Sequence, residues 1–154
     1  MTIQEFSQRL LEHMGLENFE VTVEEGEEII TLQLQVGEED SGLLIGYHGE
    51  SLQAIQKVVQ LAFFREFPTK KIVVNVNDYK ERRKAQLQEM VDKAAAKVLS
   101  SGESYIFPYL AANERLIIHE TIAQKTEYAE LESISTGDGL QRRLQIQVKV
   151  AKTE

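Results

Sequence analysis

"GLLIGYHGESLQAI", residues 42–55, places Gly46 and Gly49 three positions apart at the end of an apolar run, directly before a stretch with helical spacing. Glycine adopts backbone angles that other residues avoid, and it has no Cβ that would keep a ligand at a distance. The unpaired N–H groups at the start of the next helix suit a phosphate group. The corner is therefore either a sharp helix–helix turn or a clamp for the backbone of a single-stranded nucleic acid.

The segments on either side of this loop predict an α-β-β-α-α-β order for the first half of the chain. Apolar residues recur at helical spacing before Gly15 and after the loop, and they alternate with polar residues on both sides of Gly26. Pro68 is expected to end the helix that follows the loop. The predicted elements are a helix at 2–14, a hairpin at 18–24 and 28–36, a helical turn at 41–45, a helix at about 50–66 and a strand at 70–77.

The second half predicts a long helix, a short apolar segment, another helix and a terminal hairpin. Asp78 suits the N-cap of the long helix, and Gly102 lies just past its end. The next helix opens near Asn113, and "TGDG" at 136–139 separates two alternating segments. Neither half alternates strands with crossover helices. The fold class is therefore α+β with two small domains, 1–77 and 78–154.

The net charge of −8 is unevenly distributed over the 154 residues. Residues 1–40 carry eleven acids and one base, whereas residues 41–154 carry fourteen acids and sixteen bases. Absence of cysteine excludes disulfides and thiolate chemistry. Apolar stretches are too short for a membrane span, and the acidic, amphipathic N-terminus is not a secretory signal, so we expect a cytoplasmic protein. A basic cluster consists of Lys70, Lys71, Lys80, Arg82, Arg83 and Lys84.

Arg115 and His119 lie four positions apart in "NERLIIHE". On a helix this spacing places both side chains on one face. A guanidinium makes a forked contact with phosphate, and an imidazole donates a hydrogen bond or stacks on a base. Such a pair is also common on solvated helix surfaces, so the spacing alone leaves both interpretations open.

Both motifs, in their order, resemble known domains. "I-G-x-x-G" between two helices, after a hairpin and before a strand, resembles a type II KH domain over residues 1–77. The Arg-x-x-x-His spacing, the apolar segment with Pro108 and the terminal "GDGLQRRLQI" resemble an R-3-H domain over residues 78–154. Together they are similar to the Jag/KhpB family of bacterial RNA-binding proteins. In this sequence Tyr47 and His48 occupy the loop positions where KH domains usually carry Lys or Arg, and Leu116 replaces a second arginine of many relatives.

The resemblance implies a single-stranded RNA-binding protein, with single-stranded DNA as a further ligand and a KH-only protein as a partner. It also implies post-transcriptional regulation or RNA chaperone activity linked to cell elongation and division. Because the KH-like pattern begins at residue 2, we do not expect the N-terminal Jag-type domain of many relatives. The implied RNA contacts are Gly46, Tyr47, His48, Gly49, Arg115, His119, Arg142 and Arg143.

An enzyme is not expected from this sequence. The three histidines (His13, His48 and His119) lack metal-ligand spacing, and no nucleophile with a base partner stands out. We therefore predict no catalytic residues, no metal site, no cofactor and no small-molecule substrate. The alternative to RNA binding is a protein-interaction scaffold with a degenerate KH clamp, in which the acidic first 40 residues repel RNA.

Overall fold

The structure is a computed structural model that describes residues 1–150. Its contacts divide the chain into two compact units, Met1–Lys80 and Glu81–Glu154. The sequence placed the boundary at 77/78, and the division in the structure lies between residues 80 and 81, inside the first turn of a long helix. Among the described residues, no helix is both long enough and apolar enough to cross a lipid bilayer.

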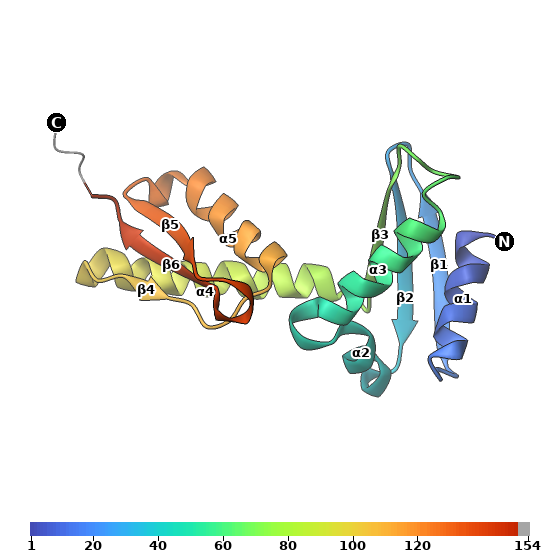
Figure 1. Cartoon of the computed structure of the whole chain (residues 1–154). Helices are drawn as coiled ribbons and strands as arrows, with labels where there is room; N and C mark the ends of the chain where they lie inside the picture. The colour runs from blue at the N-terminus through green and yellow to red at the C-terminus, as the bar shows by residue number, and fades with distance from the viewer. Residues whose placement is uncertain (151–154) are drawn as a thin grey trace. The chain divides into compact units, whose positions relative to one another are not determined.

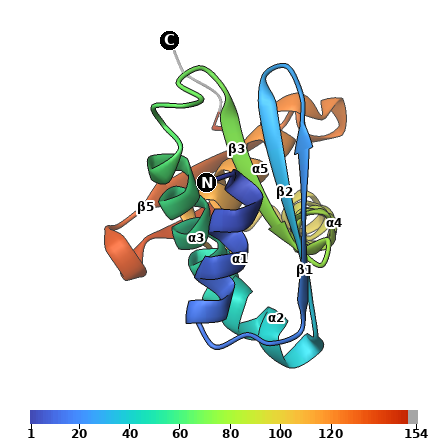
Figure 2. The same ribbon diagram turned by 90° about the vertical axis from the view of Figure 1, so that its right-hand side faces the viewer.

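The first unit has one three-stranded sheet with helices on one of its faces. Its elements (Figure 1) are α1 (Ile3–His13), β1 (Phe19–Glu25), β2 (Ile29–Val36), α2 (Glu38–Ile45), the 3₁₀ turn η1 (Tyr47–Gly49), α3 (Glu50–Ala62) and β3 (Lys71–Val76). The strands lie in the order β1-β2-β3, with β1 antiparallel and β3 parallel to β2. Figure 2 shows α1 and α3 on the same side of this sheet.

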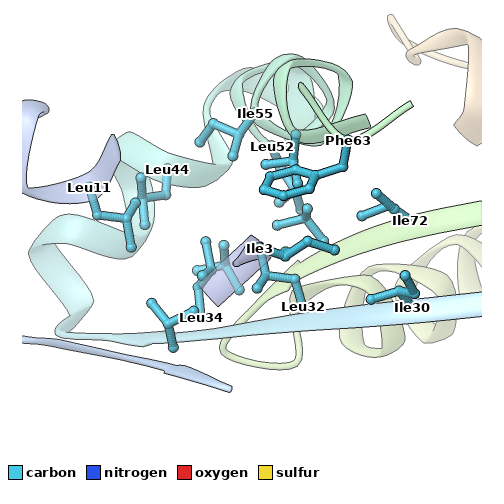
Figure 3. Close-up of a cluster of buried hydrophobic side chains, with 14 of the residues drawn as sticks. Ile3, Leu11, Ile30, Leu32, Leu34, Leu44, Leu52, Ile55, Phe63 and Ile72 are labelled. Carbon is cyan, nitrogen blue, oxygen red and sulfur yellow. The ribbon is translucent and has the colours of Figure 1, made fainter. Parts of the chain in front are cut away.

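Alternation along the strands builds the core of this unit. Leu32 and Leu34 of β2 and Val74 of β3 are buried, and they point toward the helices because successive strand residues face opposite sides. Figure 3 shows the side chains of the sheet and those of α3, among them Leu52, directed toward one another. Full burial of each such side chain contributes about 1.5–3 kcal/mol. The core thereby fixes α3 and the loop before it.

The second unit packs two helices against another three-stranded sheet. Its elements (Figure 1) are α4 (Tyr79–Ser101), β4 (Tyr105–Ile106), α5 (Ala112–Gln124), η2 (Thr126–Tyr128), β5 (Leu131–Thr136), η3 (Gly139–Gln141) and β6 (Arg143–Val148). The strands lie in the order β4-β6-β5, and both pairings are antiparallel. The fold class predicted from the sequence, α+β with a type II KH order followed by a helix-and-hairpin domain, is confirmed.

The end of α3 differs from the prediction. The helix ends at Ala62, before Pro68, so the proline does not terminate it. Phe63 leaves helical geometry with φ −108° and ψ 9°, and its side chain is buried in the core. The helix therefore ends where the Phe63 ring enters the core, and not at Pro68, which lacks a backbone N–H group.

The start of α4 also differs from the prediction. Asp78 has φ +58°, whereas an N-cap residue is extended, so Asp78 does not cap the helix in the usual way. The side-chain oxygen of Asn75 instead accepts from the N–H of Lys80 at 3.2 Å and from that of Val76 at 3.0 Å. Because Asn77 and Asp78 both have positive φ, the chain turns tightly enough for Asn75 to reach the helix start.

Candidate nucleic-acid interface

The glycine loop joins α2 to α3 through a single 3₁₀ turn. Gly46 has φ +69° and ψ −171°, a combination that is almost restricted to glycine. Gly49 has φ +79° and ψ 13°, in the left-handed region, immediately before α3 begins at Glu50. The sequence predicts a sharp turn at this position, and both glycines adopt the positive φ that this turn requires.

Contacts within the chain also favour glycine at both positions. A Cβ at Gly46 would collide with the side chain of Ser51, whose Cβ would lie 2.8 Å away. A Cβ at Gly49 would lie 3.2 Å from Cε1 of the Tyr79 ring. These contacts are sufficient reason for the two glycines, whether or not a ligand approaches the loop.

The two residues between the glycines form an aromatic pair at the surface. The rings of Tyr47 and His48 meet edge to face, with centroids 4.3 Å apart and planes at 83°. Tyr47 is 64% exposed, and His48 holds φ +51°. The Tyr47 ring suits stacking on a base, and a ring nitrogen of His48 suits a hydrogen bond to it. Neither residue supplies the fixed positive charge of a lysine or arginine.

The two apolar residues that flank the loop differ in exposure. Leu52 is only 2% exposed and belongs to the core, so it is not open to a base. Ile45 is half-buried. Leu52 therefore supports the loop from beneath and does not line a groove.

The second candidate site lies on α5 and on the residue just before β6. Arg115 is half-buried, and its Nη1 donates to the carbonyl of Leu110 at 2.6 Å. Arg142 is likewise half-buried, and its Nη1 donates to the carbonyl of Gly137 at 2.8 Å. Within residues 1–150, neither guanidinium has a carboxylate partner at ion-pair distance. Each therefore keeps most of its five N–H donors for another group.

His119 is held between two hydroxyl groups of β5. Its Nδ1 lies 2.6 Å from Oγ of Ser133, and its Nε2 lies 2.9 Å from Oγ of Ser135. Burial lowers the pKa of His119, and the positive charges of Arg115 and Arg142 lower it further. The ring is therefore neutral near pH 7, with one nitrogen donating and the other accepting.

The structure brings three of the four predicted residues of this unit together. Both Arg115 and Arg142 act electrostatically on His119. Arg143 precedes the inward-facing Leu144 on β6, so its side chain leaves the sheet on the other face. Its guanidinium lies 5.8 Å from the ring centroid of Tyr109 and donates to the carbonyl of Leu140. Arg143 thus supports the hairpin loop, away from His119.

Sequence reasoning missed the residues that hold this site in place. The two serines alternate in "LESIST", a pattern that places both hydroxyls on one face of β5, and this pattern could have identified them. Glu114, next to Arg115, is 1% exposed and accepts from Nε of Arg83 at 2.6 Å. Arg83 of the basic cluster is therefore engaged inside the protein. Among the described residues no group of three or more His, Asp or Glu side chains could hold a metal ion.

The lowered pKa of His119 makes the second unit sensitive to acid. An unfolded histidine binds a proton below about pH 6.5, but the folded one does so only at lower pH, so stability is lost as the pH falls below about 6.5. We expect wild type to lose more unfolding free energy than His119→Gln between pH 7.5 and 5.5, measured by urea denaturation. An equal loss in both proteins would contradict this role of His119.

Known protein families match both units of the chain. A family model described as the KH domain of KhpA/KhpB matches residues 2–76, and a model described as the R-3-H domain matches residues 85–147. The chain belongs to the KhpB family. The glycine loop falls within the first match, and Arg115, His119 and Arg142 fall within the second.

Curated relatives carry the name RNA-binding protein KhpB. The relative from Bacillus subtilis is 32% identical over 132 residues, which cover 84% of this chain and 62% of the relative. That from Streptococcus pneumoniae serotype 2 is 36% identical over 104 residues, which cover 65% of this chain and 32% of the relative. The chain therefore spans between about a third and three-fifths of the length of these relatives.

Proposed function

We propose that the chain binds single-stranded RNA through two modules, the glycine loop of the first unit and the Arg115–His119–Arg142 cluster of the second. The observation that carries the proposal is the pair of half-buried guanidiniums, without carboxylate partners in residues 1–150, beside a neutral histidine. Two guanidinium groups that lie near each other and have no carboxylate partner are suited to bind an anionic ligand such as a phosphate. The name of the relatives, RNA-binding protein KhpB, supports RNA as that ligand.

The glycine loop contributes shape and stacking more than charge. Tyr47 offers an exposed ring, and the loop itself carries no lysine or arginine. The eleven acids within residues 1–40 of the same unit oppose a polyanion. We therefore expect each module to bind weakly on its own, and tethering to raise the effective concentration of the second module after the first has bound.

The test measures the affinity for a labelled single-stranded RNA of about 20 nucleotides by fluorescence anisotropy at several salt concentrations. We expect Arg115→Ala to weaken binding by about 1–3 kcal/mol and to reduce the salt slope by about one, because one phosphate contact is lost. The same titration with single-stranded DNA examines the second ligand that the family resemblance implies.

The matched control is Lys93→Ala, which removes one positive charge from α4. Lys93 is exposed and pairs only with Glu89 in the described part of the chain, so its loss should leave both affinity and slope nearly unchanged. If Arg115→Ala and Lys93→Ala weakened RNA binding equally, Arg115 would contribute only to the overall positive charge and not to a specific phosphate contact. Absence of saturable binding by wild type at low salt would overturn the proposed function.

A protein partner is the second candidate function, and exposed apolar side chains of the first unit favour it. Val58, Leu61 and Phe64, on and just after α3, are 46%, 64% and 63% exposed. Aliphatic and aromatic groups at the surface suit contact with another protein, such as the KH-only partner that the resemblance implies. This candidate takes precedence if the RNA titration shows no binding.

The finer biological role is part of the proposal and rests on family resemblance. We propose post-transcriptional regulation or RNA chaperone activity, linked to cell elongation and division. Weak, tethered single-strand contacts are compatible with such a role, because each contact is released easily while the second one holds the RNA.

A further inference from the structure

The outer edge of β3 is covered by two glutamine side chains from α3. The Oε1 of Gln56 accepts from the N–H of Val74 at 3.0 Å, and the Nε2 of Gln60 donates to the carbonyl of Ile72 at 2.9 Å. These bonds satisfy polar groups that an edge strand otherwise presents to a further strand. The seam between α3 and β3 is therefore lined by glutamine side chains and not by a free strand edge.

Lys80 extends from the first turn of α4 into the same seam. Its Nζ donates to the Oε1 of Gln56 at 2.8 Å, and the side chain is half-buried. Burial lowers the pKa of Lys80, and the nearby charge of Lys71 lowers it further. No carboxylate pairs with Lys80 within residues 1–150. One of its three N–H donors is used, and the others are available.

The two neighbours of Gln56 fix the orientation of its amide. Both the N–H of Val74 and the Nζ of Lys80 are donors, so the oxygen of Gln56 has to face them. The amide nitrogen then points away from both, and it has no acceptor among the described residues. Gln56 and Lys80 together present donors only, side by side.

This donor pair lies close to the glycine loop. Tyr79, which precedes Lys80, packs its ring against Gly49. Gln56 follows Gly49 by seven residues of α3, or about 10 Å along the helix. Lys80 lies outside both family matches, which cover residues 2–76 and 85–147, so neither domain description includes it.

We propose that Gln56 and Lys80 read one base of the bound RNA and prefer guanine to adenine. Guanine presents two neighbouring acceptors, O6 and N7, which two adjacent donors can satisfy together. Adenine presents the acceptor N7 beside the donor N6 amine, and that amine would face a second donor. The inference rests on the proposed RNA binding and adds base preference to it.

The test compares oligouridines of about 12 nucleotides that carry one central guanine or one central adenine, using fluorescence anisotropy. We expect wild type to bind the guanine oligonucleotide about 5- to 50-fold more tightly. Gln56→Glu should reduce the ratio to within about twofold, because the carboxylate still accepts from Val74 and Lys80 but no longer donates. Lys80→Met should reduce the ratio as well.

The matched control is Gln53→Glu, which adds the same charge to α3 at an exposed position one turn earlier. It should lower the affinity for both oligonucleotides while it preserves their ratio. Denaturation midpoints near that of wild type establish that each variant is folded. A wild-type ratio near one, or a ratio unchanged in Gln56→Glu, would overturn the inference and leave RNA binding in place. Failure of wild type to bind either oligonucleotide would instead overturn the proposed function.

Discussion

Replacement of Glu114 by alanine is expected to destabilise the second unit by about 3–5 kcal/mol, because it removes the carboxylate from a largely buried ion pair. The Glu114 carboxylate is 1% exposed and accepts from Nε of Arg83 at 2.6 Å and from the N–H of Ala111 at 3.0 Å. Its loss removes the carboxylate that pairs with Arg83, whose side chain is 20% exposed, and the acceptor of the backbone N–H at the start of α5. Urea denaturation of wild type and variant measures the difference.

A surface ion pair on α4 is the control for this prediction. Glu89 and Lys93 of that helix pair at 2.9 Å with side chains 67% and 77% exposed. Exposed pairs contribute about 0–1 kcal/mol, so Glu89→Ala should change the unfolding free energy little. If Glu114→Ala cost no more than Glu89→Ala, the buried pair would not stabilise the start of α5, and Arg115 beside it would be held by other contacts.

Regular elements of this fold are predictable from sequence because each depends on local pattern. The hairpin of β1 and β2, the helix α1 and the glycine corner follow from residue spacing alone. The cap of α4 is not predictable in this way. It depends on Asn75 reaching over a turn formed by two residues with positive φ, Asn77 and Asp78, and such a turn has no simple local pattern.

The candidate site shows the same division. Arg115 and His119 share a helix face, which their spacing predicts. The two hydroxyls that hold the His119 ring come from β5, and the packing of α5 on the sheet, which spacing does not reveal, brings them together. Arg143 is the opposite case: it adjoins Arg142 in sequence, but strand alternation sends it to the other face.

Gly46→Ala is expected to destabilise the first unit by about 2–6 kcal/mol. Its φ of +69° and ψ of −171° lie in a region that costs a residue with a side chain about 1–3 kcal/mol. Contact of the new methyl group with Ser51 adds about 1–3 kcal/mol if the side chain cannot move away fully. Urea denaturation measures the loss. A change below about 0.5 kcal/mol would show that the loop relaxes without strain.

The same geometry decides which variant can test the RNA contact of the loop. Substitution of Gly49 by aspartate would strain a residue at φ +79° and press against Tyr79, so lost binding could reflect lost structure. His48 already has a side chain at φ +51°, and aspartate tolerates that region. His48→Asp should therefore keep the stability of wild type within about 0.5 kcal/mol while it places a carboxylate where a phosphate would lie.

Two measurements on His48→Asp, urea denaturation and the RNA anisotropy titration, separate the role of the loop in the fold from its role in binding. If His48→Asp weakened RNA binding without changing stability, the loop would contact the RNA, because the fold of the chain would be intact. Unchanged binding would mean that RNA does not approach the loop closely. In that case the two glycines serve only the turn between α2 and α3, where Ser51 blocks a side chain at residue 46 and Tyr79 crowds one at residue 49.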